Sequence, residues 1–527
     1  MKFLKKIFFP LLILFSLKGS YASHLLGGEI TWVCLKSGPN TGRYEFYLKV
    51  YRDCNGINLS TTGNIITYYN GTSGTQLGTI NVNLLSQTDI SPKCYSPALQ
   101  ISCGTPGGNP AAVEEFIFKS APTLINGVPP AGGFVFTWND CCRSNSIANI
   151  DNPGSEGHVL RAIMYPYNGL NANPCFDSSP DFAEKPSTSL PTGYLFTFNN
   201  NANDAEFDSL NYAWALPLSD IGGGWPATAA TFSAGYSVNA QLPDQTENPA
   251  NIAPVINQEF GEVSFKSLTS GLFATVLKVT AFKCGIKVSE IYRDIQIALS
   301  NTAVGNNVPV VQPPFQDAFG NYTQFSDTVY AGQSISFTIS ATDFDPGPST
   351  SQFIFTEASG IEFGSGFTNS SSGCLISPCA TLTPPPNPTI GQQTASVTTF
   401  NWQTSCDHLK YGSPCKESNV YKFVIKTRDN GCPIPAIQYS TVLIVVLPPP
   451  PVKPPELRCA SVNTDGSVTL NWKPSIDTAN IFNSYHIYSS SSANGPYTVV
   501  DSIFNINTTS FTDITANAQS SSVFYFV

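Results

Sequence analysis

The sequence predicts an all-β protein built from tandem β-sandwich modules. Phe273–Leu299 and Tyr421–Leu447 align without a gap, and each consists of two apolar, β-rich runs joined by a turn around a cysteine. The pattern Ala-x-Asp-x-acid precedes both hairpins, at 202–206 and 341–345. Charged residues make up only 12% of the chain, so Ser, Thr and Asn must supply much of its solubility. Tandem β modules of this kind are more typical of scaffolds than of enzymes.

Length and charge narrow the possible functions. At 527 residues the chain is too long for one hydrophobic core, so several domains are expected. The formal net charge of −10 leaves no basic surface on which phosphates would collect. Nucleic acid is therefore not an expected partner.

The first residues have the features of a secretory signal peptide, which we assign to 1–22. Three lysines precede the apolar run Ile7–Leu17, and small residues around Ala22 suit cleavage by a signal peptidase. This run is too short to cross a bilayer, and no later run is long enough. We therefore expect a secreted protein with no transmembrane segment after cleavage, located at the outer cell surface.

Export explains the 14 cysteines, because thiols outside the cell usually become disulfides. The absence of Cys-x-x-Cys argues against zinc ribbons and redox motifs. We expect the adjacent Cys141 and Cys142 to have separate partners, since a bond between them closes a strained eight-membered ring. A redox switch at this pair is the alternative. A bond between Cys34 and Cys54 requires another register than the hairpin that Glu29–Leu35 and Arg43–Asp53 suggest, so the pairing stays open.

Several short motifs of the first predicted module, 23–172, carry a family resemblance. The runs 23–32, 51–56, 141–143 and 147–153 resemble large surface proteins of Bacteroidetes, and 176–182, 208–212 and 292–297 extend the match over most of 23–300. In such proteins an N-terminal β region leads to immunoglobulin-like, cadherin-like or fibronectin type III repeats. Many end in a gliding-motility-associated C-terminal domain that directs type IX secretion. The resemblance implies export and cell-surface residence, and it names no ligand.

Three further modules follow. Residues 173–302 and 303–447 resemble cadherin-like or immunoglobulin-like sandwiches, each ending in one of the aligned hairpins. The linker 448–455, PPPPVKPP, favours polyproline II, which spans roughly 25 Å when extended. Residues 456–527 resemble a fibronectin type III domain that lacks its seventh strand. We therefore expect a longer protein, with any sorting domain beyond residue 527.

Alternating carboxylates suggest two calcium sites. Asp204, Glu206 and Asp208 lie in one loop, and Asp343 and Asp345 in another; hard oxygen ligands in such patterns suit calcium. The alternative is that these acids are solvated turn residues. Trp225, in a glycine-rich loop, is the best candidate for stacking on a sugar, with a core position as the alternative.

Catalysis has little support in the sequence. Gly-x-Ser-x-Gly, His-Glu-x-x-His and a phosphate-binding Gly-Lys-Ser/Thr are all absent, and the four histidines are scattered. We expect a non-catalytic surface protein that acts in adhesion or extracellular assembly, linked to gliding motility or biofilm, and that binds an extracellular protein or glycan. One alternative is the accessory region of an exported polysaccharide- or protein-degrading enzyme with its catalytic domain beyond residue 527. Another is a structural stalk without a ligand.

Overall fold

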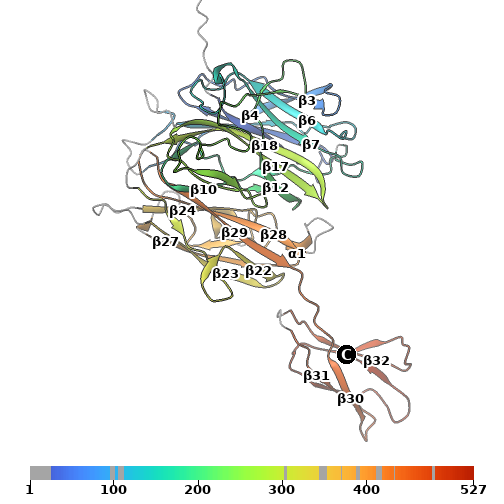
Figure 1. Cartoon of the computed structure of the whole chain (residues 1–527). Coiled ribbons are helices and arrows are strands. Elements are labelled where there is room, and N and C mark those ends of the chain that lie inside the picture. Colours follow the sequence, from blue (N-terminus) through green and yellow to red (C-terminus); the bar gives the residue numbers. More distant parts are fainter. Residues whose placement is uncertain are drawn as a thin grey trace, which may run out of the picture.

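The computed structural model describes residues 25–94, 101–104, 112–171, 173–301, 306–343, 353–368, 371–386, 392–393, 395–410, 418–432, 434–477 and 481–527. The predicted signal peptide lies outside these residues. Regular structure in the described part is almost entirely strand, which confirms the all-β expectation. The helical exceptions there are short: η1 (Pro153–Ser155), η2 (Ser365–Phe367) and α1 (Asp407–Lys410). Figure 1 shows a large body followed by a small C-terminal domain on an extended segment.

The largest sheet brings together strands from 25 to 300. Its order is β1 (Leu25–Cys34), β2 (Tyr44–Asp53), β5 (Val113–Ser120), β4 (Gln76–Asp89), β3 (Asn64–Asn70), β6 (Phe134–Asp140), β7 (His158–Met164), β18 (Ile286–Ser300), β17 (Gly271–Lys283) and β12 (Ser209–Trp214). A further strand, β9 (Ser189–Pro191), also pairs with β18. The core of this sheet contains Trp32, Phe46 and Phe136, whose ring centroids lie 4.6 to 6.4 Å apart.

Strand β18 closes the strands from β1 to β7 into a barrel-like arrangement, which we call the ring. One edge of β18 pairs with β17 over nearly its whole length. The other edge pairs with β7 at Ser289–Ile291 and then with β1 at Asp294 and Ile295, so both ends of the path from β1 to β7 meet on one strand. Gly27 makes the approach possible, because a Cβ there would lie 1.9 Å from the carbonyl oxygen of Asp294.

This ring crosses the predicted boundary between 23–172 and 173–302. Strands β1 to β7 come from the first range, whereas β12, β17 and β18 come from the second. Residues 172 and 173 therefore do not mark a break between sheets. The reason is that apolar periodicity identifies strands and hairpins locally, whereas the partner of a strand edge is chosen by contacts far away in sequence.

Residues 310–447 form a sandwich of two sheets. The first sheet has the order β19 (Val310–Val311), β23 (Ser334–Thr342), β27 (Ala395–Gln403) and β25 (Thr381–Thr383). The second has the order β22 (Ser326–Tyr330), β29 (Ile437–Leu447), β28 (Asn419–Arg428), β24 (Phe353–Ser359) and β26 (Gln392–Gln393). Aromatic side chains join the two sheets; Phe400 lies between Phe337 and Phe423, with centroid distances of 4.5 and 4.8 Å.

The sandwich and the ring are fused. Between them lies a sheet of β10 (Leu195–Asn199), β16 (Glu262–Lys266) and β15 (Ile252–Ile256). The Thr197 hydroxyl donates to the carbonyl oxygen of Tyr439 at 2.7 Å, and Phe196 shares an apolar core with Ile437 and Tyr439. Among the described residues between 25 and 447, the predicted modules are therefore fused and not separate from one another. Here the modules share buried apolar surface, which their individual strand patterns do not reveal.

Three two-stranded sheets complete the body. They are β8 (Asp181–Phe182) with β11 (Ala202–Asn203), β13 (Leu218–Asp220) with β14 (Thr228–Ala229), and β20 (Phe315–Gln316) with β21 (Tyr322–Gln324). The two aligned stretches of the sequence are indeed both hairpins, β17–β18 and β28–β29. Their roles differ, because the first closes the ring and the second forms the middle of a sandwich sheet.

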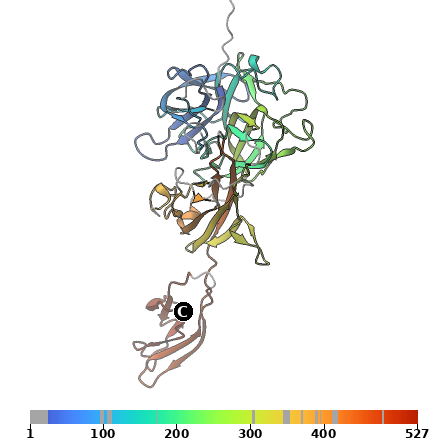
Figure 2. The ribbon, with the colours of Figure 1, turned by 90° about the vertical axis from the view of Figure 1, so that its left-hand side faces the viewer.

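The C-terminal domain stands apart from the body in both views (Figure 1, Figure 2). One sheet has the order β30 (Glu456–Val462), β31 (Val468–Lys473) and β34 (Ser510–Asp513); the other has β33 (Thr498–Ile503), β32 (Tyr485–Ser490) and β35 (Phe524–Phe526). Trp472, Leu470 and Ile487 form its small core. These two small sheets agree with the predicted fibronectin type III-like sandwich.

Disulfides form in the body, as the sequence predicts, and two of them link segments far apart in the chain. Bonds join Cys34 to Cys175, Cys54 to Cys103, Cys94 to Cys432, Cys141 to Cys142, and Cys374 to Cys379. Cys284 is also disulfide-bonded, whereas Cys406 and Cys459 are free. The expectation of separate partners for Cys141 and Cys142 is wrong. The peptide bond between them is cis, a geometry that the sequence does not announce.

Candidate functional site

The side chain of Asp204, the first acid of the predicted acidic loop, fixes the backbone of that loop through hydrogen bonds. Asp204 follows β11, and its Oδ1 accepts the backbone N–H groups of Glu206 at 2.9 Å and Asp208 at 3.1 Å. Such a turn is the usual local structure of an aspartate at a loop start. Phe207, between them, turns into the sandwich core, with its ring 5.1 Å from that of Tyr421. The loop is therefore anchored on both the ring and the sandwich.

Asp177 adds a fourth carboxyl that sequence reasoning missed. It follows Cys175, which is bonded to Cys34 on β1, and its carbonyl oxygen accepts the indole N–H of Trp32 at 3.1 Å. The neighbouring Ser178 hydroxyl donates to Glu206 at 3.1 Å, which ties this segment to the acidic loop. The only signal in the sequence was the motif 176–182, which carried a family resemblance and no spatial information.

Lys283 lies among these carboxyls. The register of β12 on β17 pairs Ser209 with Phe282, which places Asp208 opposite Lys283. The Lys283 Nζ lies 2.6 Å from Asp208 Oδ1 and 3.4 Å from Asp177 Oδ1. We call Asp177, Asp204, Glu206, Asp208 and Lys283 the acidic cluster. At its rim Lys36, which is 52% exposed, pairs with Glu206 at 2.5 Å.

Burial controls the charges of the acidic cluster. Desolvation, followed by repulsion from Asp208 and Glu206, raises the pKa of Asp204 to about 7. Desolvation and repulsion from the other carboxyls also hold the pKa of Asp177 well above its usual range. Burial by itself would lower the pKa of Lys283, but the carboxyls of Asp177 and Asp208 outweigh it and raise this pKa. Asp204 therefore exchanges its proton near neutral pH.

The geometry bears on the predicted calcium sites. The Lys283 ammonium lies between the carboxyls where a cation would have to bind, so calcium at Asp204, Glu206 and Asp208 stays a prediction that requires Lys283 to move. Asp343 is buried directly after β23, on a sandwich sheet separate from this cluster. Asp345 lies outside the described residues.

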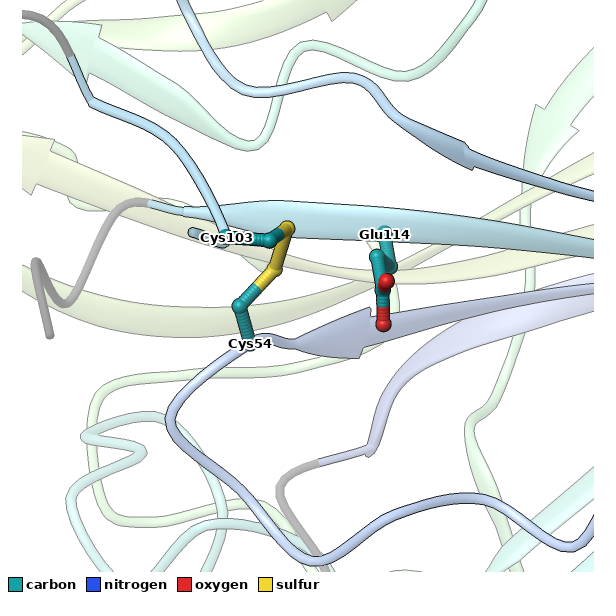
Figure 3. Close-up of side chains that lie close together, drawn as sticks. All are labelled: Cys54, Cys103 and Glu114. Atoms are coloured by element: carbon teal, nitrogen blue, oxygen red, sulfur yellow. A yellow bond between two sulfur atoms is a disulfide. The ribbon is translucent and has the colours of Figure 1, made fainter. Parts of the chain in front are cut away.

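Among the described residues, the side chains of Cys54, Cys103 and Glu114 lie close enough together to hold a metal ion (Figure 3). The two sulfur atoms are bonded to each other, as Figure 3 shows, so neither is a thiolate. A disulfide sulfur is a poor ligand, because metal binding by cysteine requires the deprotonated thiol. This group therefore stabilises the loop after β2 and does not fit a metal.

A pocket adjoins the acidic cluster at the junction of ring and sandwich. It has a volume of about 300 Å³, and its lining includes Asp204, Phe260, Lys422 and Leu443. The Lys422 Nζ donates to the carbonyl oxygen of Ala202 at 2.5 Å and to the Tyr212 hydroxyl at 2.6 Å. Desolvation lowers the pKa of Lys422 to about 7. This wall is therefore much less positive at neutral pH than a surface lysine would make it.

Trp225, the candidate sugar-stacking residue, is half-buried. It packs against an apolar group that includes Val135, Ala215 and Val276. Part of the Trp225 indole is therefore covered by strands of the largest sheet and part is open to solvent.

No helix among the described residues is both long and apolar enough to cross a membrane.

No family model matches the sequence, and no curated protein matches it. Solved structures align at low similarity. Titin domains align at 13% identity over 64% of this chain and 88% of that chain, with a TM-score of 0.15. Domains 1–6 of the surface layer protein SbsC align at 11% identity over 87% of this chain and 61% of that chain, with a TM-score of 0.15. The cadherin-like domains 1 to 4 of zebrafish RET align at 11% identity over 54% of this chain and 52% of that chain, with a TM-score of 0.14. Alignments at this level carry no conclusion about function.

Proposed function

We propose that this chain is an exported, non-catalytic protein of the outer bacterial surface that acts in adhesion or extracellular assembly. The observation that carries the proposal is its arrangement, in which one cross-linked β body holds a separate small domain at the end of a proline-rich linker (Figure 1). Such a linker keeps its two neighbours apart and lets the outer domain reach past the body.

The covalent and ionic structure of the body supports this proposal. The disulfides Cys34–Cys175 and Cys94–Cys432 are stable in oxidising surroundings outside the cell. Deeply buried charges are used in pairing: Arg293 binds Glu29, and Arg143 binds Asp294. Charges used in this way hold strands together and are not presented to a substrate.

The finer proposal follows the resemblance of the N-terminal motifs to Bacteroidetes surface proteins. In this proposal the chain belongs to the cell surface of a gliding or biofilm-forming bacterium, and its route out of the cell is type IX secretion through a C-terminal region outside this sequence. Its partner is an extracellular protein or a glycan.

Location and adhesion are tested on intact cells of the source bacterium. An antibody against the body should label unpermeabilised cells, and added protease should remove the label while a periplasmic marker stays intact. A deletion strain should attach poorly to surfaces and to other cells, and the full-length gene should restore attachment. A protease-protected protein, or normal attachment without it, would reject the proposal. Polysaccharide hydrolysis lost with the gene would favour an accessory role in a degrading enzyme.

A further inference from the structure

The pair of Lys283 and Asp208 differs from the other lysine–carboxylate pairs in the described part of the chain. The Lys283 side chain is 8% exposed and that of Asp208 is 0% exposed, with 2.6 Å between Nζ and Oδ1. The pair of Lys49 and Asp181 is almost as short, at 2.7 Å, but Asp181 is 57% exposed. In water an amine and a carboxyl remain an ion pair, whereas a dry site removes the solvent that stabilises both charges.

Strand register holds the two reacting groups together. Asp208 immediately precedes β12 and Lys283 ends β17, and these strands pair from Ser209 with Phe282 onward. Directly opposed residues on antiparallel strands have Cβ atoms about 5 Å apart, so the long lysine side chain easily reaches the carboxyl carbon. Two groups held in contact in this way react as if at very high concentration.

Asp177 supplies the third group that such a reaction requires. Its Oδ1 lies 3.4 Å from the same Nζ, and its side chain is 1% exposed. Desolvation and repulsion from the neighbouring carboxyls raise the pKa of Asp177 above its usual range. The Phe176 ring, 5.6 Å from Nζ, covers the site on one side.

We propose that Lys283 and Asp208 condense into an isopeptide bond, with Asp177 as the proton-transferring catalytic residue. The Lys283 ammonium passes a proton to the carboxyl groups, and the neutral amine attacks the Asp208 carboxyl carbon. Asp177 donates a hydrogen bond to the carbonyl oxygen as the tetrahedral intermediate forms. The N–C bond forms, the C–O bond of the leaving hydroxyl breaks, and one water departs. Ammonium and carboxylate together contain the atoms of the amide plus this water, so no cofactor or oxidant is needed.

The cross-link would add a bond that reduction does not break. It joins the residue before β12 to the last residue of β17, next to the junction of ring and sandwich. For a protein under load outside the cell, such a bond keeps the β12–β17 edge paired when disulfides are reduced. This inference does not depend on the proposed adhesive role.

Mass spectrometry of the full chain after complete reduction tests the proposal. The mature protein should be lighter than its sequence mass by one water molecule. Digestion after glutamates should then give one species in which 207–247 is joined to 263–290, with the branch at Lys283 and Asp208. The pair of Lys49 and Asp181 is the internal control and should remain unlinked, because it is exposed.

Three variants separate the reaction from mere contact. Lys283→Arg keeps the ion pair but has no amine that can condense, and Asp208→Ala removes the carboxyl; both should show the full mass. Asp177→Asn keeps both reacting groups and should also show the full mass, or gain the link at least tenfold more slowly after refolding. A wild-type protein of full mass, or a water loss mapped elsewhere, would overturn the proposal. Unimpaired linkage in Asp177→Asn would overturn the role of Asp177.

Discussion

The β body and the C-terminal domain are both mainly antiparallel β structures, but different forces hold them together. In the body, the Arg293 guanidinium binds the Glu29 carboxylate through two hydrogen bonds of 2.5 and 2.8 Å, although the residues are 264 positions apart. In the C-terminal domain, the core is apolar, around Trp472, and the pair of Arg458 and Glu456 lies on the surface. Surface pairs contribute little, whereas breaking a buried pair is costly.

This difference indicates how each part is specified. An apolar core within seventy or so residues can be assembled from strands that are close in sequence, with low entropic cost of loop closure. The ring instead depends on contacts between its first and last strands, where β1 meets β18. Disulfides such as Cys94–Cys432 then hold ring and sandwich together. The body is therefore expected to respond to single changes as one unit, and the outer domain by itself.

The largest effect is expected from Arg293→Met. This change leaves the fully buried Glu29 carboxylate without its closest partner and should lower the free energy of unfolding of the body by roughly 3–5 kcal/mol. Chemical denaturation followed by hydrogen-exchange mass spectrometry measures the loss separately in the body and in the C-terminal domain. Peptides of the C-terminal domain should keep their protection. The double variant Glu29→Leu/Arg293→Met, which removes both charges, should recover most of the loss.

Trp472→Ala makes the matching change in the other region. Trp472 is almost fully buried and packs against Tyr485 at 5.6 Å between ring centroids, so its removal should cost roughly 3–5 kcal/mol. In so small a domain this loss should unfold the residues after the linker while exchange in the body stays unchanged. Trp472→Phe is the matched control. It should cost much less, because it keeps an aromatic ring and removes an indole N–H that has no hydrogen-bond partner. Joint unfolding of the body and the C-terminal domain would contradict the expectation that each responds to a single change by itself.

The disulfides offer a comparison within the body. Cys94–Cys432 closes a loop with a sequence separation of 338, whereas Cys374–Cys379 closes one of 5. In the chain-entropy model, Cys94→Ser/Cys432→Ser should therefore cost roughly 2–4 kcal/mol, and Cys374→Ser/Cys379→Ser clearly less. Urea midpoints of the two double variants, measured without reductant, check the order. Equal losses would mean that the long bridge does not restrict the unfolded chain.

Local sequence patterns predicted the parts of the fold that local forces decide. The alternating runs in Phe273–Leu299 and Tyr421–Leu447 do form hairpins. The loop of Asp204 was also predictable, since its turn uses only neighbouring N–H groups.

Other features depend on partners that no local pattern can specify. The closure of the ring requires β18 to accept β1, and the only trace of this in the sequence is a glycine at position 27. Asp177 reaches the acidic cluster through the Cys34–Cys175 bond and the Trp32 indole, both long-range contacts. The bond between Cys141 and Cys142 was also missed, because the spacing of cysteines in a sequence does not show which of them pair.

The smallest expected effect compares two aspartates that make the same turn in the two regions. Asp204 in the body and Asp465 in the C-terminal domain each accept the backbone N–H two residues ahead, at 2.9 and 3.0 Å. Desolvation raises the pKa of Asp204 from 3.8 to about 7, whereas hydrogen bonds from Ser467 lower the pKa of the exposed Asp465. The same local structure thus carries opposite pKa shifts, because one carboxyl is buried and the other is not.

The two shifts predict opposite slopes of stability with pH. Between about pH 4 and 7 the folded body holds a proton on Asp204 that the unfolded chain has released, so the free energy of unfolding should fall as pH rises and level off above pH 7. Asp204→Asn keeps the turn acceptor, should flatten this slope and should stabilise the body by about 1–2 kcal/mol at pH 8. Asp465 contributes stability above its unfolded pKa that is lost as pH falls, so Asp465→Asn should matter only above about pH 4 and in the opposite direction. Unfolding curves from about pH 2 to 8 cover both windows and measure both slopes. An Asp204→Asn body that is less stable at pH 8 would mean that the carboxylate is held by partners stronger than the repulsion within the acidic cluster.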